Sequence, residues 1–226
     1  MSKGLDAVSL NKRAWERVAE KYYKAHYGKV SEVFNFFCEK LPKGSSVLDV
    51  GCGTGLPFAK LLVERNFNVI GIDVSSRMVR IAQKNVPTAE FRELSMTDIN
   101  FEKEFEGVLS SFSMLLLDPP LFKDIAGRIV RCLKNDGLFC LALNEPREEG
   151  ADVDGEAVVE IMGEKMYSRA YTKNEVLEAF VPLGMKQLKF NREIRTSKEF
   201  GEEHVIEFVL KKTKPVHSSL ASAHVN

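Results

Sequence analysis

The sequence contains no run of 18 apolar residues, and its start, MSKGLDAVSLNKR, has no apolar stretch of the kind that forms a signal peptide. We therefore expect no membrane contact and a cytoplasmic protein. The sequence also has no net charge, because its 32 basic and 32 acidic side chains cancel. Attraction to nucleic acid or to anionic lipid is thus not built into the whole molecule, and only a local patch could supply it.

Cysteine is scarce, and the four cysteines have no spacing typical of metal ligands. Cys52 lies inside a glycine-rich turn, and Cys132 and Cys140 fall in apolar segments. We expect no metal site, and we expect these thiols to be reduced, small, buried residues of a cytosolic protein.

One concentrated signal is present, the segment SVLDVGCGTG at positions 46–55. Branched apolar residues around one acid predict a strand that is buried on both faces and runs straight into three glycines. Glycine permits the sharp turn that follows and the approach of a ligand to bare backbone. The next strand, 68–73, ends on Asp73, about 20 residues after the glycines, a spacing that places a carboxylate on a ribose diol. This pattern predicts a nucleoside site.

The same turn lacks the features of a phosphate site. A dinucleotide fingerprint has the spacing Gly-x-Gly-x-x-Gly, whereas here the third glycine, Gly55, comes one residue early. No Lys or Arg lies between positions 44 and 59, and no Gly-Lys-Ser/Thr follows. Asp49 and the carbonyl groups of the loop instead suit a cationic amino-acid end. Adenosine joined to a charged amino acid is S-adenosylmethionine.

Five segments in order, VLDVGCGTG, VIGIDVSSRMV, SMTDINF, FEGVLSSFS and RIVRCLKNDGLFCLAL, resemble class I S-adenosylmethionine-dependent methyltransferases of the small-molecule type. The resemblance extends over residues 15–212 and is most specific over 46–144. A nicotinamide-binding Rossmann domain is the alternative, since it shares the pattern of strand, glycines, helix and acid. Several ordered segments favour the methyltransferase, whose cofactor is S-adenosylmethionine.

The remaining sequence alternates between helical and extended patterns. It predicts an α/β fold: a doubly wound, mostly parallel seven-stranded sheet with an antiparallel C-terminal hairpin and helices on both faces. Helices are expected over 9–27, 30–40, after Ser75, and over 122–133 and 173–181. Strands are expected over 46–50, 68–73, 89–94, 107–112, 138–143, 186–195 and 204–212, with a turn at 135–137.

Three segments lie outside the expected βα units. Residues 1–45 precede the first strand and are expected to form a helical lid or cap over the methyltransferase domain, 46–212. Residues 144–170 are expected to contain a short hairpin around Met162-Gly163, which either builds the acceptor pocket or only covers a sheet edge. Residues 213–226 lack periodicity and are expected to be a disordered tail.

The resemblance implies roles for residues around the methionine end and the ribose of the cofactor. Asp73 would accept hydrogen bonds from both ribose hydroxyls, with Asp49 near the ammonium group. Tyr22 or Tyr23 would close over the carboxylate, or else pack in the core. The backbone would meet the methionine end at Gly51, Gly53, Gly55 and Ser111.

The resemblance also implies an adenine subsite. Met78 would lie against the ring, although a Met at such a helix position is otherwise ordinary core. The family's adenine-binding acid falls where this chain has Ser95, so Ser95 and the backbone of Met96 are expected to contact adenine. Asp98, three positions later, remains a possible contact.

Methyl transfer is an in-line displacement at an activated sulfonium, so the protein needs mainly to align the acceptor and exclude water. His26 is the candidate base, because the other histidines lie in the tail or at a remote strand. The acceptor is expected to be a small molecule; Tyr167, Arg169 and Tyr171 would bind an anionic one, or lie on the surface.

Two other functions remain open: an RNA- or protein-directed methyltransferase, and a catalytically silent cofactor-binding protein. A monomer or a homodimer is expected. DNA is not an expected partner, because Asp118-Pro119-Pro120 lacks a following aromatic residue and is better explained as a helix start.

Overall fold

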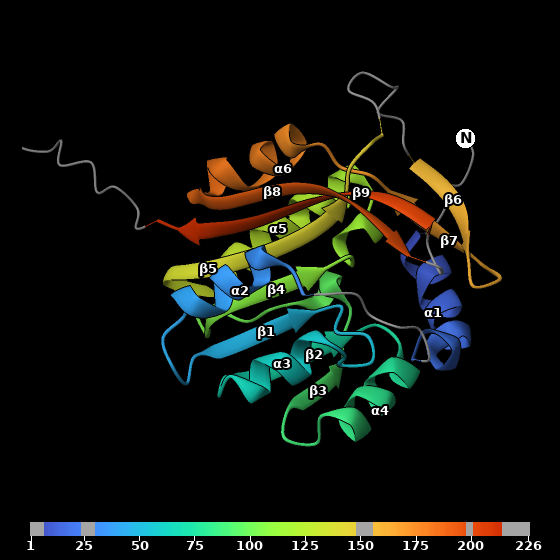
Figure 1. Ribbon diagram of the computed structural model, residues 1–226, viewed down its shortest axis with the longest axis horizontal. Helices are drawn as coiled ribbons and strands as arrows, with labels where there is room; N and C mark the ends of the chain where they lie inside the picture. The colour runs from blue at the N-terminus through green and yellow to red at the C-terminus, as the bar shows by residue number, and fades with distance from the viewer. Residues whose placement is uncertain (1–6, 24–29, 148–155, 198–200, 214–226) are drawn as a thin grey trace, which may run out of the picture.

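The computed structural model describes residues 7–23, 30–147, 156–197 and 201–213. Its centre is a seven-stranded sheet in the order β3-β2-β1-β4-β5-β9-β8 (Figure 1). The first five strands along the chain are parallel: β1 (Ser46–Val50), β2 (Asn68–Asp73), β3 (Glu90–Glu93), β4 (Phe105–Ser111) and β5 (Leu133–Asn144). The chain changes direction of winding between β1 and β4, the position at which open α/β sheets bind ligands.

The last two strands form the expected antiparallel hairpin. β8 (Met185–Ser197) pairs with β9 (Gly201–Lys212), and β9 pairs in turn with β5. This arrangement confirms the predicted sheet, including its antiparallel end.

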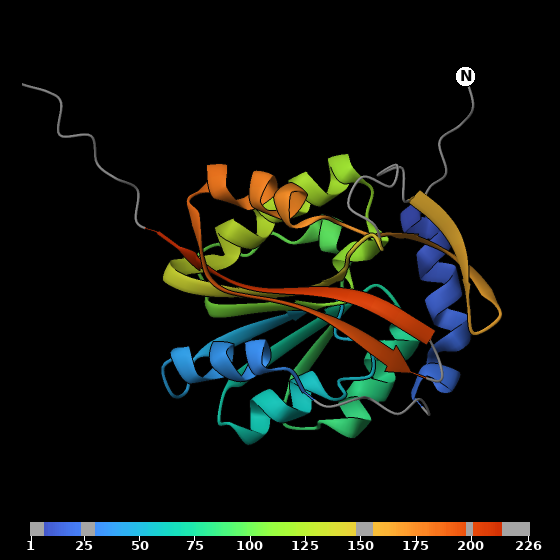
Figure 2. The ribbon, with the colours of Figure 1, turned by 45° about the horizontal axis from the view of Figure 1, so that its top comes forward.

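Helices cover both faces of the sheet, as Figure 2 shows. One face carries α2 (Glu32–Lys40), α3 (Phe58–Glu64) and α4 (Ser76–Asn85), and the other carries α5 (Pro119–Cys132) and α6 (Lys173–Phe180). Three short 3-10 turns follow strands or helices: η1 (Met96–Asp98), η2 (Met114–Leu116) and η3 (Val181–Leu183).

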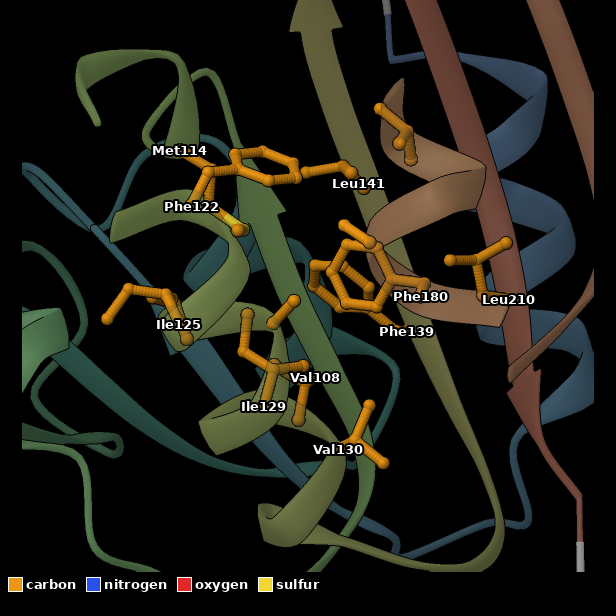
Figure 3. Close-up of a cluster of buried hydrophobic side chains, with 14 of the residues drawn as sticks. Val108, Met114, Phe122, Ile125, Ile129, Val130, Phe139, Leu141, Phe180 and Leu210 are labelled. Atoms are coloured by element: carbon orange, nitrogen blue, oxygen red, sulfur yellow. The ribbon is translucent and has the colours of Figure 1, made fainter. Parts of the chain in front are cut away.

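The larger core lies between the sheet and the pair α5 and α6 (Figure 3). Phe139 and Leu141 of β5 point into it beside Phe122 of α5 and Phe180 of α6, and all four are at most 2% exposed. The alternate β5 residue Cys140 faces α2 instead. Burial of both faces explains why the sequence of this strand is a continuous apolar run. Burying each large apolar side chain stabilises the fold by roughly 1.5–3 kcal/mol.

The N-terminal helix and the inserted hairpin lie together at the carboxyl ends of the parallel strands (Figure 1). α1 (Ala7–Tyr23) packs Ala14 and Val18 against Met166, in the hairpin of β6 (Glu156–Ile161) and β7 (Glu164–Arg169). The hairpin turns at Met162-Gly163, as predicted, and forms a sheet of its own. None of the described helices is long and apolar enough to cross a membrane.

The prediction of a turn at residues 135–137 is wrong, because these residues lie within β5. The pairing of β5 with β4 shifts from Leu133 opposite Phe105 to Leu138 opposite Gly107, and Asp136 takes a left-handed φ of 64°. The Asn-Asp-Gly sequence therefore makes a bulge, which satisfies the same backbone preferences as a turn without ending the strand.

Two further boundaries differ from expectation. α5 begins at Pro119, because the Asp118 side chain accepts a hydrogen bond from the N–H of Leu121 and caps the helix. In the expected tail, Thr213 is held by hydrogen bonds to Gly184, and residues 214–226 lie outside the described part of the chain.

Candidate functional site

A cleft of about 800 Å³, including its open mouth, lies at the carboxyl ends of β1, β2 and β4. Its walls are the glycine turn, the end of β2, the segment around η1, the segment around η2, and α1. Most of the residues expected at a cofactor site line it: Tyr22, Gly51, Gly53, Asp73, Met78, Ser95, Met96 and Ser111.

The glycine turn connects β1 to α3. Two of its glycines line the cleft, and a different physical reason requires glycine at each. Gly51 has a φ of +73°, and a Cβ there would lie 2.3 Å from the Cβ of Ser113. Ser113 is itself fixed, because its hydroxyl donates to the carbonyl oxygen of Val50 over 2.6 Å. Gly53 has a φ of +52°, and the nearest atom to a Cβ there is Cε1 of Tyr22, 3.7 Å away. Gly51 is thus required by packing, whereas Gly53 presents bare backbone to the cleft.

Asp73 ends β2 and directs its carboxylate toward the glycine turn. One oxygen accepts a hydrogen bond from the N–H of Gly53 and the other from the N–H of Ser75, each over 2.9 Å. Burial raises the pKa of the carboxyl to about 6, against the lowering effect of these two hydrogen bonds. Ser75 also accepts from the N–H of Met78, which confirms the predicted cap of α4.

Three of the expected site residues do not line the cleft. Asp49 is 3% exposed on β1, and burial followed by the charge of Asp73 raises the pKa of its carboxyl to about 7. Gly55 packs against Ala82 and Phe91, where a Cβ would come within 3.3 Å of each side chain. Asp98 lies at the end of η1 and is exposed.

The segment expected at adenine forms one wall. Ser95 caps η1 by accepting from the N–H of Thr97 over 3.2 Å, and the two hydroxyls are 2.8 Å apart. Met96 follows in the lining. Met78 of α4 also lines the cleft; it is 1% exposed and belongs to a buried cluster with Ala19 of α1. The lining here therefore combines two apolar methionine side chains with two hydroxyl groups.

The helix α1 covers the cleft with one face, made of Val8, Asn11, Trp15 and Tyr22. The amide of Asn11 donates to the carbonyl oxygens of Leu116 and Tyr167, each over 3.1 Å, and accepts from the N–H of Tyr167 over 2.8 Å. This one side chain fixes α1 to η2 and to β7. His26 falls outside the described residues.

Sequence reasoning missed part of the lining. The positions of Val8 and Asn11 share a helix face with Tyr22, so their spacing was a usable signal. Two more, Leu94 and Thr97, flank the predicted Ser95 and Met96 at η1. The other missed residues come from β2, its following loop, and the segments around β4 and η2, and no local pattern marks them: Ile72, Val74, Phe112, Ser113, Leu116 and Leu117.

The polar residues expected at an anionic acceptor, or else at the surface, are buried. Arg169 and Tyr171 are 5% and 1% exposed, and neither lines the cleft. Arg169 pairs with Glu175 over 2.7 Å, and the hydroxyl of Tyr171 donates to the carbonyl oxygen of Leu117 over 2.7 Å. Tyr167 is 5% exposed on β7, so the surface alternative is wrong for all three.

Comparison with known proteins agrees with this geometry. Residues 47–137 match the family model described as "Methyltransferase domain". A 90-residue segment is 30% identical to dTDP-3-amino-3,4,6-trideoxy-alpha-D-glucopyranose N,N-dimethyltransferase of Streptomyces venezuelae, covering 40% of this chain and 38% of that protein. The chain thus spans about two fifths of the length of this curated relative.

Two solved structures share the fold over most of their length. A methyltransferase dependent on S-adenosylmethionine from Methanosarcina mazei superposes with a TM-score of 0.71 at 16% identity, over 82% of this chain and 99% of that chain. The cyclase SpnF superposes with a TM-score of 0.72 at 17% identity, over 92% and 97%. At these identities they establish the fold alone.

The sheet order, the glycine turn and the acid-ended β2 beside a cleft define the class I methyltransferase fold. Residues 47–137 also match a methyltransferase domain in sequence, so the sequence comparison and the shared fold agree.

Proposed function

We propose that the protein binds S-adenosylmethionine in the cleft between α1 and the sheet and transfers its methyl group to a small-molecule acceptor. One observation carries the proposal: the Asp73 carboxylate, the bare backbone of Gly53 and the Ser95–Met96 wall meet in one cleft. No Lys, Arg or His is among the described residues that line it. Such a lining fits a nucleoside that carries an amino acid in place of phosphates.

Each end of the cofactor has a proposed partner. Asp73 accepts hydrogen bonds from the ribose hydroxyls, while Met78, Ser95 and Met96 hold adenine. The backbone at Gly51, Gly53 and Ser111 meets the methionine end, and Tyr22 closes over it. Asp49 stands behind the turn, where its charge would favour the ammonium group through the field rather than by contact. For Gly55 and Asp98, we propose packing and surface roles in place of contact.

The cofactor's sulfonium supplies the activated methyl group, so the chain's contribution is alignment and the exclusion of water. α1, held by Asn11, forms the lid that separates the cleft from solvent. We retain His26 as a proposed base for acceptors that must lose a proton.

The test is transfer of a labelled methyl group from S-adenosylmethionine to separated fractions of a cell extract. We expect label in the small-molecule fraction. Label only in RNA or protein would assign the alternative acceptors, and cofactor binding without transfer to any fraction would indicate a silent binding protein.

We also propose that the protein works in the cytoplasm. Cys38, Cys52, Cys132 and Cys140 are free and buried, and burial raises the pKa of each thiol. Inert, reduced thiols of this kind suit a reducing compartment.

A further inference from the structure

We infer that the methyl acceptor is an uncharged, largely apolar molecule. The inference rests on the proposed function and adds the chemical class of its substrate. Among the described lining residues that have no proposed cofactor contact are Val8 of α1, Phe112 after β4, and Leu116 and Leu117 around η2. These side chains present hydrocarbon and one aromatic ring to whatever lies there.

The polar side chains beside them are already engaged. Both polar atoms of the Asn11 amide are used, in its three hydrogen bonds to Leu116 and Tyr167. The hydroxyl of Ser113 donates to the Val50 carbonyl and lies 2.7 Å from the hydroxyl of Ser110. An acceptor therefore gains little by offering hydrogen-bonding groups to this part of the wall.

Two described cations near these side chains are paired within the fold. Arg195 approaches the Phe112 ring with its guanidinium carbon 5.8 Å from the centroid, but it forms ion pairs with Glu193 and with Glu207, the latter over 3.0 Å. Arg169 is paired with Glu175, as described above. Among the described lining residues, the one formally charged side chain is Asp73, whose oxygens both accept backbone hydrogen bonds.

The consequence for binding follows from desolvation. An anionic acceptor would leave water without meeting a countercharge in the described lining, and a buried unpaired charge is strongly disfavoured. A neutral ring would exchange water for Phe112, Leu116 and Leu117, which is favourable in proportion to the apolar area covered. The same carbon skeleton should therefore bind when neutral and fail to bind when it carries a phosphate.

A matched pair of probes tests this difference. The protein is first saturated with S-adenosylhomocysteine, whose binding is measured separately, and is then titrated with 1-naphthol or with 1-naphthyl phosphate. We expect 1-naphthol to bind at least about tenfold more tightly than its phosphate. Equal or tighter binding of the phosphate would overturn the inference, and so would failure of both probes to bind. Intact binding of S-adenosylhomocysteine in either case would leave the proposed cofactor site standing.

A charge placed in the wall makes the test specific to this part of the cleft. Leu116→Lys adds a cation to this part of the wall. It should weaken the binding of 1-naphthol and strengthen the binding of 1-naphthyl phosphate, so that the affinity for 1-naphthol divided by the affinity for its phosphate falls about tenfold or more. Leu183→Lys is the matched control, because Leu183 is 40% exposed on η3 and does not line the cleft. It should leave the ratio unchanged. An unchanged ratio in a folded Leu116→Lys variant that still binds S-adenosylhomocysteine would contradict the inference.

Discussion

The carboxylate of Asp73 accepts a hydrogen bond from the backbone N–H of Gly53 over 2.9 Å. This bond ties the turn after β1 to the end of β2, two segments that are 20 residues apart in the chain. It explains how an acid and a glycine far apart in sequence form one binding surface. It also means that the acid shapes the glycine turn, in addition to its proposed contact with the ribose.

Asp73→Ala should weaken binding of S-adenosylhomocysteine by on the order of 2–3 kcal/mol, or roughly 30- to 150-fold. The substitution removes the proposed acceptor of the ribose hydroxyls and loosens the turn. Folding should survive, because the side chain faces the cleft. Calorimetric titration measures the affinity, and circular dichroism checks the fold. An unchanged dissociation constant would leave Asp73 with a purely structural role.

The glycines should separate packing from ligand contact. Gly51→Ala places a Cβ 2.3 Å from the Cβ of Ser113 at a φ of +73°. Overpacking and backbone strain together should therefore lower the stability by roughly several kcal/mol. The new Cβ of Gly53→Ala would lie 3.7 Å from its nearest neighbour, so this substitution should cost only about 1–2 kcal/mol in stability. It should also weaken binding of the cofactor. Gly127→Ala, inside α5, is the control and should be neutral or slightly stabilising. Denaturant melts give the order; equal losses at Gly51 and Gly53 would refute this distinction.

Asp49 should make the protein less stable as the pH rises. Burial raises the pKa of its carboxyl from 3.8 to about 7, so between these values the folded state holds a proton that the unfolded chain has released. The free energy of unfolding therefore falls as pH increases from about 4 to 7, by on the order of 2–4 kcal/mol from this group. Melts from pH 5 to 8 should show this slope. Asp49→Asn should remove the part above pH 6, because the raised pKa of Asp73, about 6, contributes a slope of the same sign below that pH. The exposed Asp124→Asn should leave the slope unchanged, and a slope above pH 6 that survives Asp49→Asn would assign it to another group.

The strands and the glycine turn could be predicted from sequence because their patterns are local. β1 and β2 have the expected limits, since each is a short apolar run, and a glycine follows the first while an acid ends the second. The cap at Ser75 and the hairpin at Met162-Gly163 were likewise readable from adjacent residues. The local prediction that failed was the turn at residues 135–137, because a bulge and a turn use the same residue types.

The proposed acceptor end of the cleft could not be predicted from sequence, because long-range packing creates it. Leu116 lines the cleft together with Asn11, which lies 105 positions earlier and donates a hydrogen bond to the Leu116 carbonyl oxygen. Likewise Gly55 belongs to a motif that suggests ligand contact, yet its neighbours are Ala82 and Phe91. A motif shows which backbone must be bare, but only the assembled fold shows what lies against it.

We predict that α1 is a lid whose order depends on the cofactor. It packs against the hairpin and α4, and it contributes nothing to the two main cores of the sheet. Amide exchange in residues 9–23 should slow on addition of S-adenosylhomocysteine, and slow more than in β1 and β4. Asn11→Ala should speed exchange in the free protein. Equal protection of α1 with and without ligand would make the helix a fixed part of the molecule.

The most direct test of the cofactor assignment is calorimetric titration of the protein with S-adenosylhomocysteine and, separately, with NAD. The account predicts saturable one-to-one binding of S-adenosylhomocysteine and no binding of NAD, because the third glycine comes early and the described lining of the cleft offers no cation for a pyrophosphate. Tight binding of NAD without binding of S-adenosylhomocysteine would contradict it.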